Sequence, residues 1–92
     1  MLSAYPACFF KEDNGYSVIF PDLGYLATCG ETIDEAFAMA IDALAGYLFT
    51  AKLDKDPIPA PSEIKTIDAA AVAKELEVEP GEYFVNMVTV DV

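Results

Sequence analysis

The chain has 92 residues, with 16 acidic and 5 basic side chains, so its formal net charge is −11. The length allows one domain, and the hydrophobic fraction of 54% is typical of a globular protein rather than a disordered one. So few Lys among so many carboxylates cannot build a basic groove for nucleic acid. The absence of His removes Ser-His and Cys-His catalysis and most zinc chemistry. An acidic surface instead favours a basic protein partner.

The N-terminus predicts neither a signal peptide nor a membrane anchor. The first ten residues lack a positively charged start, and Pro6 interrupts their apolar run. We find no stretch close to the ~20 apolar residues of a membrane-spanning helix. We therefore expect a cytoplasmic protein. Cys8 and Cys29 form no CxxC pair and are expected to be small buried hydrophobic side chains, with a disulfide or a reactive thiol as the alternative.

The first thirty residues predict three strands joined by tight turns. Asn14-Gly15 is a strong hairpin signal between the first two strands. Pro21 and Gly24 bound a second turn, since Pro cannot continue a ladder and Gly permits a positive φ. The predicted strands cover 3–10, 15–20 and 25–29. Such short connections predict an antiparallel meander.

A long helix follows from Thr32 to about Ala51, where apolar residues recur at three- and four-residue spacings. Thr32 and Glu35 form a capping-box pattern. In this motif the Thr hydroxyl accepts a hydrogen bond from the Glu amide, and the Glu carboxylate reaches back toward the start of the helix. Frequent Ala residues keep the helix slim, so it can lie close to a sheet.

The last third of the chain predicts an extended connector, a short helix and a strand. Prolines alternate over 57–62, which predicts a stiff connector laid over the domain, with a PxxP-like recognition strip as the alternative. A shorter helix is expected over 67–76, with Asp68 as its N-cap. The stretch 83–92 is the clearest strand, with apolar side chains on both faces.

A strand that is apolar on both faces is either central in a covered sheet or part of an oligomer interface. For the second case we predict an interface through Phe84, Val88 and Val90. The whole element order is three strands, a long helix, a connector, a short helix and a strand. It predicts an α+β fold, with a mainly antiparallel sheet of about four strands and the long helix packed on it.

The residues predict no catalytic site, no metal site and no cofactor. Carboxylates concentrate in turns and at helix ends instead of converging on one cleft. Ser and Thr have no His to activate them. Asp54-Lys55-Asp56 resembles the start of a calcium loop, but the Gly and the distant Glu are wrongly placed. The aromatic residues of the first two strands are expected in the core or an interface rather than stacked on RNA.

Four ordered blocks of the sequence resemble the HicB family of antitoxins. The family pattern is roughly YP…GGYxVxFPDLPG…TxGDTxEEA…A…L…PIPxPS. The matching blocks here are YPA at 5–7, GYSVIFPDL at 15–23, TCGETIDEA at 28–36 and PIPAPS at 57–62. The terminal strand agrees too, so the resemblance covers nearly the whole chain. Gly24-Tyr25 stands where the family often has Pro-Gly.

The resemblance implies a partial RNase H-like fold without nuclease activity. It also implies a partner, a small basic HicA-type toxin that cleaves RNA with the help of a His, and an antitoxin that binds the toxin and blocks its site. Dimers or tetramers are common among such proteins. Many members append a DNA-binding module; this chain stops after the last strand, so we expect a single domain over 1–92 and no direct DNA binding.

For the toxin contact we predict the turn formed by Asp22, Leu23, Gly24 and Tyr25. Pro21 and Gly24 fix this turn, and Tyr is enriched at protein interfaces. The alternative is an ordinary turn. Two other functions stay open: an RNA-binding domain of RNase H-like ancestry, and a solitary oligomerising module without a toxin partner.

Overall fold

The computed structural model describes residues 2–79 and 81–91. The elements are β1 (Leu2–Glu12), β2 (Gly15–Phe20), the 3₁₀ turn η1 (Pro21–Leu23), β3 (Leu26–Gly30), α1 (Ile33–Leu53), the 3₁₀ turn η2 (Ile64–Thr66), α2 (Ala69–Glu75) and β4 (Tyr83–Asp91). The predicted order of elements and the α+β class are confirmed. Val92, which the predicted last strand included, lies outside the described residues.

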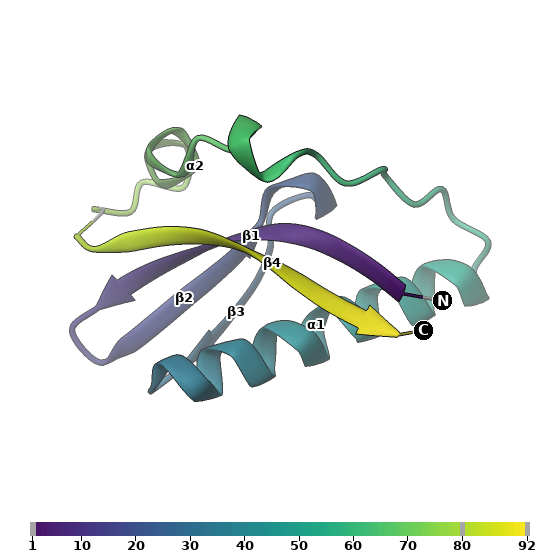
Figure 1. Ribbon diagram of the computed structural model, residues 1–92, viewed down its shortest axis with the longest axis horizontal. Coiled ribbons are helices and arrows are strands. Elements are labelled where there is room, and N and C mark those ends of the chain that lie inside the picture. Colours follow the sequence, from purple (N-terminus) through teal and green to yellow (C-terminus); the bar gives the residue numbers. More distant parts are fainter. Residues whose placement is uncertain (1, 80, 92) are drawn as a thin grey trace.

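The four strands form one antiparallel sheet in the order β3-β2-β1-β4 (Figure 1). The β1–β2 hairpin closes at Glu12 and Gly15, as the Asn14-Gly15 signal predicts. β4 returns antiparallel along β1, from Leu2 opposite Asp91 to Phe10 opposite Tyr83. Of the two alternatives for the last strand, a central place in the sheet is ruled out, because β4 is an edge strand; the oligomer interface stays a prediction. The two interior strands are β1 and β2, and each contributes buried side chains to both faces of the sheet.

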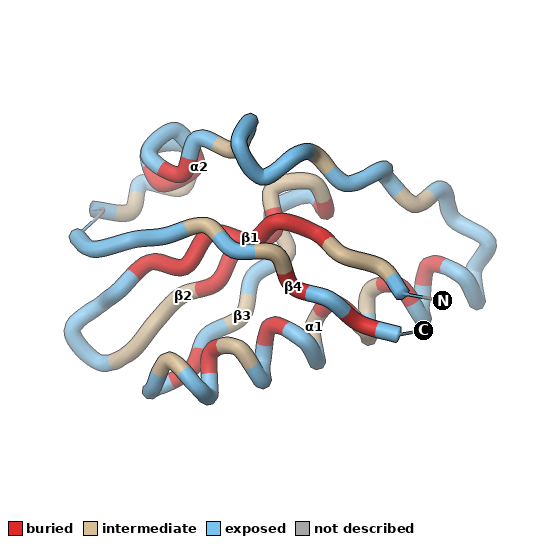
Figure 2. Tube along the Cα trace, viewed as in Figure 1, coloured by how far each residue is buried: buried red, intermediate tan, exposed pale blue. Residues whose placement is uncertain are grey.

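Two helices cover opposite faces of the sheet, so the molecule has three layers (Figure 1). Alternate residues of each strand point to opposite faces, and they join two separate clusters. Facing α1, the cluster includes Phe9, Val18, Phe20, Ala40, Leu44 and Val88. Facing α2, it includes Cys8, Phe10, Ile19, Ala69, Val72 and Ala73. Figure 2 shows the buried residues concentrated in the middle of β1, in the second half of β2 and along the inner stripe of α1.

The predicted burial of the aromatic residues is confirmed for most of them. Phe9 is fully buried, and its ring centroid lies 4.5 Å from that of Phe37 and 4.7 Å from that of Phe84. These separations fall in the range where aromatic pairs attract one another beyond simple area burial. The three rings tie β1, α1 and β4 together. The interpretation as core residues rather than an RNA-stacking surface therefore agrees with the structure.

The start of α1 is fixed by its cap and by a close approach to β3. The Thr32 hydroxyl accepts a hydrogen bond from the Glu35 amide at 3.1 Å, as predicted. The Glu35 carboxylate accepts from the Glu31 amide at 3.4 Å, one residue earlier than the capping box expects. A Cβ on Gly30 would lie 2.4 Å from the Ala36 amide nitrogen, so only Gly lets the helix start this close to the strand.

The structure bears on the membrane and cysteine expectations. By length and composition alone α1 could cross a membrane, contrary to the sequence expectation, although a helix packed on a sheet meets the same criterion. Cys8 is buried as predicted, and burial, followed by the negative charge of Asp68, raises its pKa to about 11. Cys29 is exposed, because it lies on the edge strand β3, whose outer face α2 does not cover. The thiols of Cys8 and Cys29 are both free.

Candidate protein-interaction site

The predicted contact turn contains one core residue and two surface residues. Leu23 is buried with 3% of its surface exposed, while Gly24 is exposed and Tyr25 keeps 39% of its surface. Gly24 has φ 66° and Tyr25 has φ 62°, so two consecutive residues adopt the left-handed conformation. This conformation costs a non-Gly residue about 1–2 kcal/mol. The turn therefore holds a tyrosine at a position that glycine fits better.

The remaining residue of the turn, Asp22, bonds to the proline connector. Its two carboxylate oxygens accept hydrogen bonds from the Ser62 amide and from the Ser62 hydroxyl, both at 2.7 Å. Nearby, the Tyr5 hydroxyl donates to the Pro59 carbonyl at 2.6 Å, and Ile58 packs against the core. Burial, followed by the charge of Asp22, raises the pKa of Tyr5. The connector lies over the domain as predicted, and the hydrogen bonds to Asp22 are among the contacts that hold it there.

The residues predicted for an oligomer interface share one face of β4. Val88 and Val90 are buried against α1, with 2% and 6% of their surface exposed. Phe84 is 37% exposed and stacks on Phe9. Two of the three side chains are thus part of the core of the single chain. A contact with a second copy through these residues, like a contact through the Asp22–Tyr25 turn, stays a prediction.

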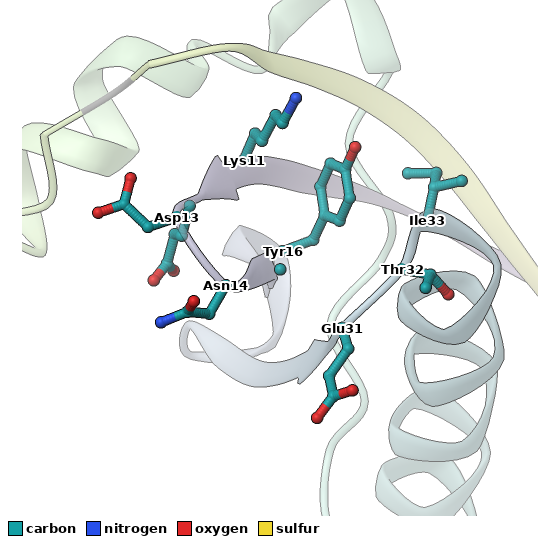
Figure 3. Close-up of a pocket in the computed structure, with 9 residues that line it drawn as sticks. Lys11, Asp13, Asn14, Tyr16, Glu31, Thr32 and Ile33 are labelled. Carbon is teal, nitrogen blue, oxygen red and sulfur yellow. The ribbon is translucent and has the colours of Figure 1, made fainter.

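The structure brings together an acidic surface that the sequence reasoning missed. An open hollow of about 840 Å³ forms where the β1–β2 hairpin meets the start of α1 (Figure 3). A second, overlapping hollow extends it to the loop after α2. We call the combined surface the acidic hollow. Its carboxylates are Glu12, Asp13, Glu31, Glu35 and Glu79.

Local hydrogen bonds order part of the acidic hollow. The Glu12 carboxylate accepts from the Ser17 hydroxyl, and Glu35 is fixed by its bond to the Glu31 amide. Lys11 is the one cationic side chain in the lining, and it lies 3.9 Å from a Glu82 carboxylate oxygen. Figure 3 shows the Lys11 ammonium and the carboxylates of Asp13 and Glu31 pointing away from one another. With five carboxylates and one ammonium group in its lining, the acidic hollow is a net negative surface.

This arrangement suits the binding of cationic groups on another molecule. Among residues 2–79 and 81–91, no three Asp, Glu or Cys side chains are grouped as a metal site would require. Spread carboxylates on an open surface attract Lys and Arg of a protein partner instead. The sequence showed each acid only as a turn or helix-end residue. The hairpin, the β3–α1 junction and the loop after α2 become neighbours only through the fold.

Comparison with known proteins places this geometry in a family. The family model described as the HicB-like antitoxin of bacterial toxin-antitoxin systems matches residues 5–92. Antitoxin HicB 2 of Photorhabdus laumondii is 41% identical over 58 residues, which are 63% of this chain and 42% of that protein. Antitoxin HicB 1 of the same organism is 42% identical over 52 residues, which are 54% of this chain and 34% of that protein. The matches thus span less than half the length of either relative.

Solved structures share the fold. A toxin-antitoxin complex from Streptococcus pneumoniae includes a chain with a TM-score of 0.85 and 33% identity, covering 99% of this chain and 70% of that one. A chain of the HicA3 and HicB3 toxin-antitoxin complex has a TM-score of 0.73 and 23% identity over 98% of this chain and 100% of that one. The N-terminal domain of antitoxin HicB from Burkholderia pseudomallei has a TM-score of 0.66 at 24% identity, over 98% of this chain and 100% of that one. With the family match over nearly its whole length, this chain belongs to the HicB-like antitoxins of bacterial toxin-antitoxin systems.

Proposed function

We propose that this chain is an antitoxin that binds a small basic HicA-type toxin and covers the site where the toxin cleaves RNA. In this proposal the chain is not an enzyme, and catalysis belongs to the toxin. Family membership supports the role, and the HicA3 and HicB3 complex is a precedent for such a pair in a protein of similar fold. The single observation that carries the proposal is the acidic hollow on a chain of net charge −11.

The proposed mechanism is electrostatic mimicry. A protein that binds RNA presents Lys and Arg to phosphate groups. The carboxylates of the acidic hollow offer the same cationic side chains a negative partner, so the antitoxin occupies the surface that RNA needs. Opposite charge also steers the encounter and speeds association at low ionic strength. All five carboxylate residues of the acidic hollow are exposed, so each ion pair with the toxin contributes modestly and affinity depends on their sum.

The first test mixes the purified chain with the candidate basic toxin and measures binding by calorimetry at low and high salt. We expect one copy of this chain to bind one toxin molecule, with an affinity that falls as salt rises. We also expect the chain to inhibit the toxin's cleavage of RNA. Failure to bind, or binding without inhibition, would refute the proposal. Incubating the chain alone with RNA adds a check, because cleavage or tight RNA binding by the chain itself would favour the RNA-binding alternative.

Charge variants then locate the surface. In the acidic hollow we would neutralise Asp13→Asn, Glu31→Gln and Glu79→Gln together. Exposed ion pairs are worth about 0.2–1 kcal/mol each, so the triple variant should lose about tenfold in affinity. The matched control neutralises three exposed acids elsewhere, Asp42→Asn, Asp56→Asn and Glu75→Gln. An equal loss in both variants would show that only net charge matters.

The predicted turn contact is a separate surface and is tested separately. The acidic hollow lies at the Gly15 end of β2, and the turn follows Phe20 at the other end. Tyr25→Ala leaves the acidic hollow unaltered, so a loss of toxin affinity in this variant would show that the turn contributes to binding. An unaltered affinity would leave the turn as an ordinary connection. The hollow variants and this variant therefore discriminate between two faces of one antitoxin.

A further inference from the structure

Residues 63–79, which comprise η2, α2 and the loop that follows α2, cover one face of the sheet between two hydrogen-bonded anchors. At the first anchor, the amide and the hydroxyl of Ser62 both donate to the Asp22 carboxylate at 2.7 Å. At the second, the Lys11 amide donates to the Glu82 carbonyl at 2.8 Å. Among the described residues, the hydrogen bonds of 63–79 all stay within this segment. We call the segment the α2 lid.

Small apolar side chains hold the α2 lid to the sheet. The cluster has six buried residues, half from the lid and half from the sheet: Ala69, Val72, Ala73, Cys8, Phe10 and Ile19. Figure 2 shows the lid exposed except on the inner side of α2. Stabilisation by burial scales with the apolar area removed from water. Lifting α2 from the sheet therefore costs less than lifting α1, which buries Leu44 and Leu48.

The α2 lid depends on the sheet for its own folding. α2 has 7 residues, fewer than the about 12–15 that an isolated helix needs to be even marginally stable. Just after α2, Glu77 has φ 57°, a left-handed conformation that disfavours residues other than Gly. An open lid regains backbone entropy and releases Glu77 from this conformation. Few buried contacts and no hydrogen bonds to the sheet are the features of a segment that opens locally.

We propose that the α2 lid opens as a unit while α1 and the four strands stay folded, and that a toxin in the acidic hollow holds the lid closed. Opening uncovers the sheet face that carries Cys8, Phe10 and Ile19, which are buried when the lid is closed. The larger cluster under α1 keeps its packing. Opening of the lid does not depend on the antitoxin function, whereas its closure by the toxin rests on the proposed function.

The end of the α2 lid forms one wall of the acidic hollow. Val78 and Glu79 line the hollow together with the β1–β2 hairpin and the β3–α1 junction. Opening carries both residues away, so the hollow loses one of its carboxylates. A basic partner therefore binds the closed form more tightly, by about 1.5- to 5-fold for one exposed ion pair. By linkage, the bound partner shifts the lid toward closure by the same factor.

The buried thiol of Cys8 reports the opening. In a Cys29→Ser background Cys8 is the single thiol, and it is fully buried, so neutral iodoacetamide reacts only after the face is uncovered. Where the labelling rate is proportional to reagent concentration, its ratio to the rate in the urea-unfolded chain gives the equilibrium constant for opening. We expect this constant to exceed the global unfolding constant at least about tenfold, with a weaker dependence on urea.

A thiol on the other face of the sheet is the matched control. Val18 is fully buried in β2 and faces α1, so a Val18→Cys variant that also carries Cys8→Ala and Cys29→Ser should react only through global unfolding. Circular dichroism checks the fold, and urea denaturation gives each variant its own unfolding constant. Cys8 labelling no faster than global unfolding allows, or an equal excess at both thiols, would overturn the proposal.

Two exposed alanines locate the opening within the chain. Ala71→Gly weakens α2 and Ala38→Gly weakens α1, and neither removes a buried side chain. Helix propensity sets each effect at about fivefold. Ala71→Gly should speed labelling of both thiols, because it destabilises the closed form from which every opening starts. Ala38→Gly should speed labelling in the Val18→Cys variant alone; faster Cys8 labelling there, or unchanged Cys8 labelling in Ala71→Gly, would refute independent opening of the lid.

Saturating toxin separates the two halves of the proposal. Bound toxin should slow Cys8 labelling by about 1.5- to 5-fold, and Glu79→Gln should remove most of this slowing while the toxin still binds. Unchanged labelling in a complex whose formation calorimetry shows would refute closure by the toxin and leave the antitoxin function intact. A toxin that does not bind would refute the proposed function and closure by the toxin together, and Cys8 labelling would still decide whether the lid opens.

Discussion

Replacing Asp22 tests whether the proline connector is fastened to the sheet by one carboxylate. Asp22 accepts two hydrogen bonds of 2.7 Å from Ser62, forty positions away in the sequence. Hydrogen bonds to a charged group contribute about 1.5–3 kcal/mol each, and partial exposure of both residues lets water replace part of that. We expect Asp22→Ala to lower the free energy of unfolding by about 2 kcal/mol, and Ser62→Ala, which keeps the amide donor, by about 1 kcal/mol.

Urea denaturation of the two variants and of the double variant measures the coupling energy between these residues. The slope with urea should stay unchanged, because the folded chain buries nearly the same surface. Trypsin cleavage after Lys55 and Lys65, which flank the connector, should also accelerate in Asp22→Ala before the rest of the domain unfolds. Two independent results would refute the reasoning: an Asp22→Ala variant within about 0.5 kcal/mol of wild type, or additive single effects with no coupling.

Three further changes test the backbone, the turn and the buried thiol. Gly30→Ala would put a Cβ 2.4 Å from the Ala36 amide nitrogen and should lower the free energy of unfolding by about 3 kcal/mol. Gly46→Ala, whose Cβ meets nothing within 4 Å, should raise it by about 0.5–1 kcal/mol. Equal effects of the two variants in thermal unfolding would contradict the close approach of α1 to Gly30. Tyr25→Gly relieves a φ of 62° and should not lower stability, while toxin affinity falls if the turn makes contact. The folded chain raises the pKa of Cys8 from 9.0 to about 11 and so holds the thiol proton more tightly than the unfolded chain. This stabilisation is fully present below pH 9 and is lost as pH rises toward 11; the loss is at most about 2.7 kcal/mol. The urea midpoint should therefore fall less between pH 9 and 11 in Cys8→Ala than in wild type.

Local patterns in the sequence were enough to predict the order and type of the elements. The hairpin signal at Asn14-Gly15, the Thr32 cap and the Asp68 cap each act within a few residues, and each appears in the structure. The aromatic residues of the first two strands were predicted to lie in the core or an interface, and most of them are buried. Ordered motif blocks led to the HicB-like family, which the family match over residues 5–92 confirms.

Contacts between distant segments were decided only by the tertiary structure. The apolar pattern of 83–92 could not distinguish a central strand from an edge strand, because β4 pairs with β1, which lies at the other end of the sequence. The tertiary structure also places α2 on the face of the sheet opposite α1, and it brings the carboxylates of three separate connections together in the acidic hollow. Asp22 likewise acquires its role from Ser62. Sequence therefore determined which segments form strands and helices, since those preferences are local, and the fold determined which surfaces those segments present to a partner.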